Sequence, residues 1–162
     1  MTSLRAPRID PNTLPGRPCS AAAALEIVGD RWSLLAVREV MFGNRRFGEI
    51  ARNTGAPRDR LAARLKALVE AGVLERRQYQ DSPARWDYHL TPAGVALAPV
   101  LEALLQWGDE WAVDTPPITL LHHDHPLRGA WICAECGETV HRRDLRRRMN
   151  VPGWDVAGPV AD

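Results

Sequence analysis

The stretch that decides the fold is Pro57-Arg58-Asp59-Arg60-Leu61-Ala62-Ala63-Arg64-Leu65-Lys66-Ala67-Leu68-Val69. Leu61, Leu65 and Leu68 stand at positions i, i+4 and i+7, and therefore share one face of a helix. Proline is tolerated in a first helical turn, and Gly72 follows where a left-handed cap would end the helix. We predict a helix from Pro57 to Ala71 with one apolar face and basic side chains on the rest of its surface.

The flanking segments suggest what this helix does. A short helix is predicted over Phe47–Thr54, and Gly55-Ala56 makes a break of the length found in a helix-turn-helix. Downstream, Val73–Tyr79 and Trp86–Leu90 read as two strands, and turn-forming residues separate them. This order of elements predicts a winged helix-turn-helix, a mainly α fold with a small β-hairpin as its wing.

Composition limits the alternatives. The 162 residues suffice for one domain of about 100 residues and a tail. The net charge is only +1, so affinity for nucleic acid must come from a local patch. Residues 38–85 hold eleven arginines and lysines against six carboxylates. No apolar run is long enough to span a bilayer, and the N-terminus lacks the apolar core of a signal peptide. We therefore expect a cytoplasmic location.

Three segments are expected along the chain. Residues 1–18 are rich in proline and arginine and form a flexible N-terminal arm. Residues 19–112 form the winged domain, with helices at about 19–28 and 92–111. Ser20 is the expected N-cap of the first helix, and Thr91 with Pro92 opens the last. Residues 113–162 form a C-terminal extension.

Several motifs in order carry a resemblance to a known family. They are Cys19 with its alanine-rich helix, Gly29–Leu35, Arg45–Ile50, Leu61–Leu68, Gly72–Arg76 and Tyr88–Gly94. Over Cys19 to about Trp111 the chain resembles the HxlR family of bacterial winged-helix regulators, relatives of the MarR type. The resemblance implies a homodimer that binds operator DNA near promoters.

The last helix of the winged domain has more apolar surface than a small domain can cover alone, which suggests a partner surface. The residues concerned are Leu97, Val100, Leu101, Leu104, Leu105, Trp107 and Trp111. In the family that the chain resembles, this helix packs with the first helix across a two-fold axis. The alternative is a helix folded back on its own domain. A two-fold dimer would present two recognition helices about 34 Å apart and predicts a pseudo-palindromic site.

The predicted DNA contacts fall into two groups. Arg58, Arg60 and Arg64 are the candidates for base edges, because a guanidinium can grip guanine O6 and N7 together. Contacts to phosphates, which position a protein without specifying sequence, are assigned to Arg45, Arg46, Arg52, Lys66, Arg76, Arg77 and Arg85. The alternative for each is a solvated side chain or an ion pair with Asp59, Glu70 or Glu75.

The three cysteines are an odd number, which argues against a disulfide framework and leaves thiol or metal chemistry open. Cys19 stands at a helix N-terminus near Arg17, and both features lower a thiol pKa. Some members of the family that the chain resembles use a cysteine at this place to sense oxidants or electrophiles. We therefore treat Cys19 as a candidate sensor, with a small buried residue as the alternative.

Cys133-x-x-Cys136-Gly137 has the form of half a zinc ribbon. Four-coordinate zinc would need two further ligands, for which His125 and His141 are the nearest choices and His122 and His123 the alternates. A second cysteine pair is missing. A metal-free knuckle and a redox dithiol therefore stay open beside zinc.

The favoured function is that of a homodimeric, sequence-specific DNA-binding regulator. Repression is favoured because blocking a promoter needs no contact with polymerase, and response to an oxidant or small molecule is left open. We see no Ser/His/Asp set, glycine-rich phosphate loop or paired-carboxylate motif, so we expect no enzyme and no required cofactor. The rival hypotheses are a thiol or zinc protein built on Cys133 and Cys136, and a winged-helix interaction scaffold, which Arg60 and Arg64 disfavour.

Overall fold

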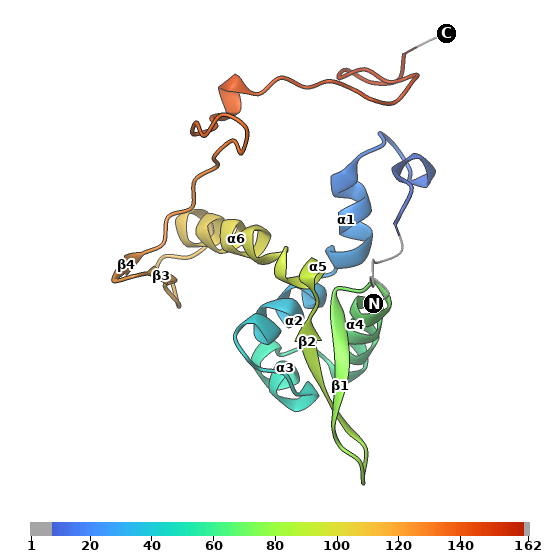
Figure 1. Ribbon diagram of the computed structural model, residues 1–162, viewed down its shortest axis with the longest axis vertical. Coiled ribbons are helices and arrows are strands. Elements are labelled where there is room, and N and C mark those ends of the chain that lie inside the picture. Colours follow the sequence, from blue (N-terminus) through green and yellow to red (C-terminus); the bar gives the residue numbers. More distant parts are fainter. Residues whose placement is uncertain (1–7, 161–162) are drawn as a thin grey trace. The chain divides into compact units, whose positions relative to one another are not determined.

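The computed structural model describes residues 8–160, which divide into two units between Leu101 and Glu102 (Figure 1). The first unit holds α1 (Ser20–Val28), α2 (Arg31–Met41), α3 (Phe47–Thr54), α4 (Arg58–Glu70), β1 (Leu74–Gln80), β2 (Arg85–Leu90) and α5 (Pro92–Val95). The boundary falls inside α6 (Ala98–Trp111), and the second unit holds β3 (Leu121–His122) and β4 (His125–Pro126). The α-rich first unit and its two-stranded hairpin are consistent with the predicted winged helix-turn-helix.

Helix α4 lies where the leucine pattern predicts it. Leu61, Leu65 and Leu68 are fully buried, and they pack with residues of α2 and with Ile50 of α3. Pro57 is the N-cap and not part of the first turn, since its ψ of 136° is extended. Gly72 adopts a φ of +67° just after the helix, as a left-handed cap requires.

The turn between α3 and α4 is short and is fixed by its own hydrogen bonds. Gly55 ends α3 with a φ of +69°, which a residue without Cβ adopts freely. Thr54 Oγ1 accepts a hydrogen bond from the N–H of Ala56 at 3.2 Å and donates one to the Ile50 carbonyl at 2.7 Å. These bonds fix the angle at which the chain enters the basic helix.

The caps of the first two helices differ from each other. Asp30 caps α2 by accepting a hydrogen bond from the N–H of Trp32 at 2.9 Å. At α1 the N-cap is Cys19, so the prediction that Ser20 fills this position is wrong. Ser20 is the first helical residue of α1, whereas Cys19 before it has an extended backbone with φ of −151°. The cysteine therefore lies at the N-terminus of α1, next to its first backbone N–H groups.

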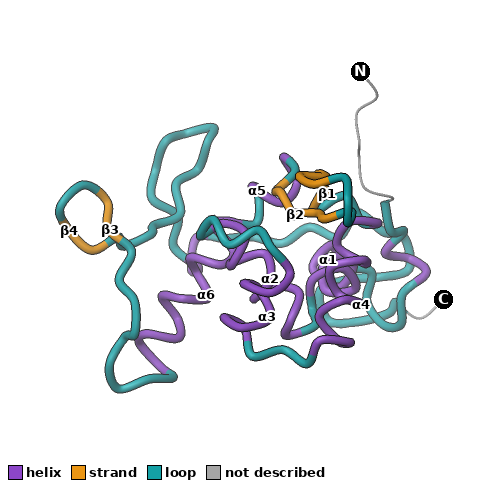
Figure 2. The backbone as a smooth tube through the Cα atoms, turned by 90° about the horizontal axis from the view of Figure 1, so that it is seen from below, coloured by secondary structure: helices purple, strands orange, loops and turns teal. Residues whose placement is uncertain are grey.

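The hairpin is attached to the helices at its base. Strands β1 and β2 are antiparallel, with Leu74 opposite Leu90 and Arg76 opposite Tyr88. The Tyr88 N–H donates to the Arg45 carbonyl at 2.9 Å, and Arg46 forms an antiparallel bridge with Asp87. The segment that leads into α3 is therefore hydrogen-bonded to the outer edge of β2. Figure 2 shows α2, α3 and α4 grouped together with the hairpin alongside them.

The prediction of a single helix over residues 92–111 is wrong in one respect. The structure divides this segment into two helices, α5 and α6. Thr91 caps α5 as predicted, accepting from the N–H of Gly94 at 3.2 Å. Pro99 lies in the first turn of α6, where its missing N–H has no cost. In a continuous helix its ring would collide with the carbonyl of Val95, which explains the break.

The remaining segments contain little regular structure. In the N-terminal arm, Met1–Pro7 lies outside the described residues, and a 3-10 turn at Pro11–Thr13 is capped by Asp10. In the extension, β3 pairs with β4 and a second 3-10 turn covers Arg142–Asp144. Within residues 8–160 no helix has both the length and the apolar character needed to cross a membrane.

Candidate nucleic-acid interface

The three arginines predicted to read bases all lie on the surface of α4. Arg58 and Arg60 are exposed and Arg64 is half-buried. The Arg58 guanidinium stacks over the ring of Phe47, 4.8 Å from its centre. Within the described part of the chain none of the three forms an ion pair with a carboxylate. Their charges are therefore free to meet an outside anion or a base edge.

Two of the predicted phosphate contacts have acidic neighbours instead. Lys66 lies 3.7 Å from Glu70, and Arg77 lies 2.5 Å from Glu75. Such exposed pairs are worth about 0–1 kcal/mol each, so a phosphate can replace the carboxylate at little cost. These two residues contribute less free positive charge than the arginines of α4.

An open cleft of about 780 Å³ brings α3, the start of α4 and the hairpin together. Its lining residues are Arg46, Phe47, Gly48, Glu49, Arg52, Arg58, Tyr79, Arg85 and Trp86. Four guanidinium groups from separate parts of the sequence thus surround one hollow, opposed by a single carboxylate. A cleft with this charge is suited to a phosphate backbone.

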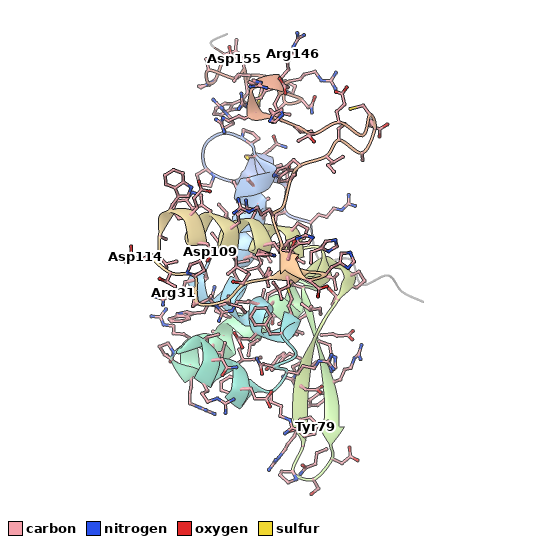
Figure 3. All side chains as sticks on the ribbon, turned by 90° about the vertical axis from the view of Figure 1, so that its left-hand side faces the viewer. Arg31, Tyr79, Asp109, Asp114, Arg146 and Asp155 are labelled. Atoms are coloured by element: carbon pink, nitrogen blue, oxygen red, sulfur yellow. The ribbon has the colours of Figure 1, made fainter. Side chains whose placement is uncertain are left out.

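The aromatic residues of the wing were not predicted as part of the interface. Arg46 lies 4.9 Å from the centre of the Tyr79 ring, and Arg76 lies 4.6 Å from that of Trp86. Tyr79, labelled in Figure 3, stands on the part of the hairpin toward its turn. Stacking of this kind orients a guanidinium without neutralising it. The signal in the sequence was the presence of both arginine and aromatic residues in each of the two strands.

A buried carboxylate sets the position of α3 against α2. Glu39 accepts hydrogen bonds from Arg38 at 2.7 Å, Asn44 at 2.8 Å and Asn53 at 2.9 Å. Burial favours the neutral acid, but these donors, Asn53 foremost, outweigh burial and lower the pKa of Glu39 below its ordinary 4.5. The sequence analysis did not predict this role for Glu39.

The residues predicted for dimerisation differ in how far they are buried. Leu101 is buried in the core of the first unit, and Leu97 packs against the same core. Val100, Leu104, Trp107 and Trp111 are exposed, with Trp111 at 69%. Their spacing of four, three and four residues places them along one face of α6. Leu105 is half-buried. These four exposed residues define an apolar stripe on α6 that is not covered in the single chain.

Cys19 is exposed, contrary to its alternative interpretation as a small buried residue. Its pKa is lowered below 9.0, mainly by the backbone N–H groups of Ala22 and Ala21 and to a smaller extent by Arg17. These amides are among the donors at the start of α1 that have no partner within the helix. The thiol is therefore accessible and inclined to ionise.

The extension holds the predicted knuckle. The Cys133 carbonyl accepts from the N–H of Gly137 at 2.8 Å, and the Cys133 N–H donates to the Glu138 carbonyl at 2.9 Å. Backbone N–H groups of Cys136 and Glu135 lower the pKa of Cys133. Within residues 8–160 no three metal-binding side chains gather, so His125 and His141 are not brought to the two thiols.

Comparison with known proteins agrees with this geometry. The family model of HxlR-like helix-turn-helix proteins matches residues 27–115. The HTH-type transcriptional regulator Rv3095 of Mycobacterium tuberculosis is 46% identical over 131 residues, which cover 78% of this chain and 82% of that protein.

Two solved structures extend the likeness. The proposed transcription factor PA1607 is 35% identical with a TM-score of 0.72, over 80% of this chain and 94% of that one. The reduced form of the regulator YodB of Bacillus subtilis is 31% identical with a TM-score of 0.50, over 58% and 94%. These relatives are transcriptional regulators and not enzymes. The chain belongs to the HxlR-like helix-turn-helix family of DNA-binding transcriptional regulators.

Proposed function

We propose that this protein is a homodimeric repressor that recognises a pseudo-palindromic operator through α4. The observation that carries the proposal is a set of arginines on α4 that pair with no carboxylate among the described residues, beside a cleft lined with four guanidinium groups. The set consists of Arg58, Arg60 and Arg64. Arginines on a helix that enters the major groove read guanine, and those of the cleft and the wing bind phosphates. Occupation of a promoter by such a dimer blocks transcription without any contact to polymerase.

The apolar stripe of α6 supports the dimer. Trp107 is 59% exposed in the single chain, and a tryptophan covers a large apolar area. Pairing two copies through this stripe would remove four apolar side chains per copy from water. A two-fold pair would also present its two α4 helices about 34 Å apart, which matches successive major grooves.

Regulation by thiol oxidation is the second part of the proposal. An exposed cysteine of lowered pKa at a helix N-terminus is the form in which reactive thiols occur. The likeness to the YodB fold in its reduced form supports a redox comparison. We propose that oxidation of Cys19 alters the start of α1 and thereby the affinity for DNA.

The test of the function is binding of the purified chain to the DNA upstream of its own gene. A scrambled duplex of the same composition is the control. Preference for the upstream duplex supports an operator-binding regulator, and adding diamide to the complex then tests Cys19.

A further inference from the structure

The second unit contains two tight turns that carry side chains able to bind metal. In the first, His122 and His125 are paired across the β3–β4 hairpin, and their rings lie 5.6 Å apart. His123 between them has a φ of +52°, as the short connection demands. In the second, Cys133 and Cys136 occupy a turn closed by the Gly137 N–H at 2.8 Å from the Cys133 carbonyl. Both turns hold their side chains three residues apart.

This spacing is that of the cysteine pairs in structural zinc sites. A zinc ribbon combines two such turns, each supplying two of the four ligands. The histidine pair can take the place of the missing second cysteine pair, because imidazole nitrogen is also a common zinc ligand and Cys₂His₂ sites occur in structural zinc domains. We propose that His122, His125, Cys133 and Cys136 together form a four-coordinate zinc site that joins the two turns.

The backbone argues against His141 as a ligand. Cys133 pairs with Glu138, Ile132 with Thr139, and the Val140 N–H donates to the Trp131 carbonyl at 2.8 Å. His141 therefore lies beyond the open end of this ladder. Three strand steps separate it from the thiols, a distance of about 10 Å. His123 is the middle residue of its turn and stands apart from the paired positions.

The two turns do not meet in this structure, because within residues 8–160 no three metal-binding side chains gather. The proposed site therefore forms when the segment that links the turns closes around the metal. All described residues from 121 to 132 are exposed, and only seven residues separate His125 from Cys133. A chain of this length is long enough to reverse direction and too short to carry the turns far apart. The free energy of binding four ligands is available to order this segment, as it is in small zinc domains.

The experiment measures metal in the full-length chain, purified under reducing conditions, by zinc analysis and by titration with Co²⁺. We expect one zinc per chain and a visible Co²⁺ spectrum of tetrahedral type with a thiolate-to-metal band. His122→Ala and Cys136→Ser should each lose this stoichiometric metal. The matched controls, His123→Ala and His141→Ala, should keep it.

Three results would overturn the site. One is the absence of zinc and of a tetrahedral Co²⁺ spectrum in the unmodified chain. Another is metal that survives His122→Ala or is lost in His141→Ala, which would assign a different ligand set. The last is one zinc per two chains that depends on the cysteines alone, which would mean four thiolates shared between copies. DNA binding in the His122→Ala chain tests the regulator function separately, since α4 does not depend on this site.

Discussion

Asn53 Nδ2 donates a 2.9 Å hydrogen bond to the buried carboxylate of Glu39, and this bond joins α3 to α2 fourteen residues earlier in the chain. Asn44 donates to the same Oε2 at 2.8 Å, and Arg38 contacts the other oxygen. Because α3 and its turn lead directly into α4, this network helps to position α4, the helix that we propose reads DNA. A single carboxylate thus connects packing in the core to the proposed DNA-binding surface.

Replacing Glu39 tests this connection. Glu39→Gln should lower the free energy of unfolding by about 1–3 kcal/mol near neutral pH, because hydrogen bonds to a charged group become bonds to a neutral one. The folded pKa of Glu39 is lowered, so its contribution is present above 4.5 and is lost as the pH falls through the folded value. The difference between the two proteins should therefore shrink in acid.

Urea denaturation at about pH 7 and about pH 3.5 measures both effects. Glu26→Gln, on the exposed surface of α1, is the matched control and should change stability by less than about 0.5 kcal/mol. A difference between wild type and Glu39→Gln that grows in acid would contradict a lowered pKa for Glu39 in the folded chain.

Gly94 is packed too tightly for a side chain. A Cβ at this position would collide with the Val73 carbonyl and lie 3.0 Å from the side chain of Leu90. Gly94→Ala should therefore destabilise the base of the hairpin by about 1–3 kcal/mol, as overpacking does. Gly48 lies inside α3 with open space around it, so Gly48→Ala should leave stability equal or higher. Equal thermal midpoints for both variants would show that the α5 contact is loose.

The dimer can be tested on the apolar stripe of α6. Leu104→Glu introduces a charge among exposed apolar residues, and we expect it to shift the chain from dimer to monomer in sedimentation velocity. Gln106→Glu adds the same charge to an exposed position of α6 outside the stripe and should leave the dimer intact. If Leu104→Glu sediments as the wild type does, the copies do not pair through this face.

The two classes of basic residue should respond differently to substitution. Arg60→Ala and Arg64→Ala should weaken binding to the operator by about 1–3 kcal/mol and leave binding to scrambled DNA almost unchanged. Arg85→Ala should weaken both equally and reduce the salt slope by about one. Unchanged operator affinity in both α4 variants would remove the base-reading assignment.

Cys19 should react faster than an ordinary thiol. Its folded pKa lies below 9.0, so the pH at which alkylation by iodoacetamide reaches half its maximal rate should rise when the chain is unfolded in urea. Mass spectrometry of the peptide carrying Cys19 measures the rate. A midpoint that stays the same in the folded and unfolded chain would remove the basis for sensing.

The sequence predicted what depends on short-range patterns. The burial of Leu61, Leu65 and Leu68 followed from their spacing, and the cap at Thr91 followed from residue chemistry. Three-dimensional packing decided the rest. Leu101 and Leu104 are chemically alike, yet one lies in the core and the other in solvent, and no local pattern separates them.

The candidate site shows the same division. The arginines of α4 could be chosen from the sequence because a helix repeats every 3.6 residues. The cleft could not, since Arg46, Arg58 and Arg85 meet only after the hairpin has folded against α3 and α4. Glu39 was also out of reach, because its burial depends on donors from Asn44 and Asn53 further along the chain.

The most direct measurement is fluorescence anisotropy of the full-length chain on the duplex upstream of its own gene and on a scrambled duplex, over a series of salt concentrations. We predict tight binding to the upstream duplex, weak binding to the scrambled one, and a steep fall in affinity with salt as phosphate contacts are lost. No binding to either duplex at low salt would contradict DNA recognition by α4.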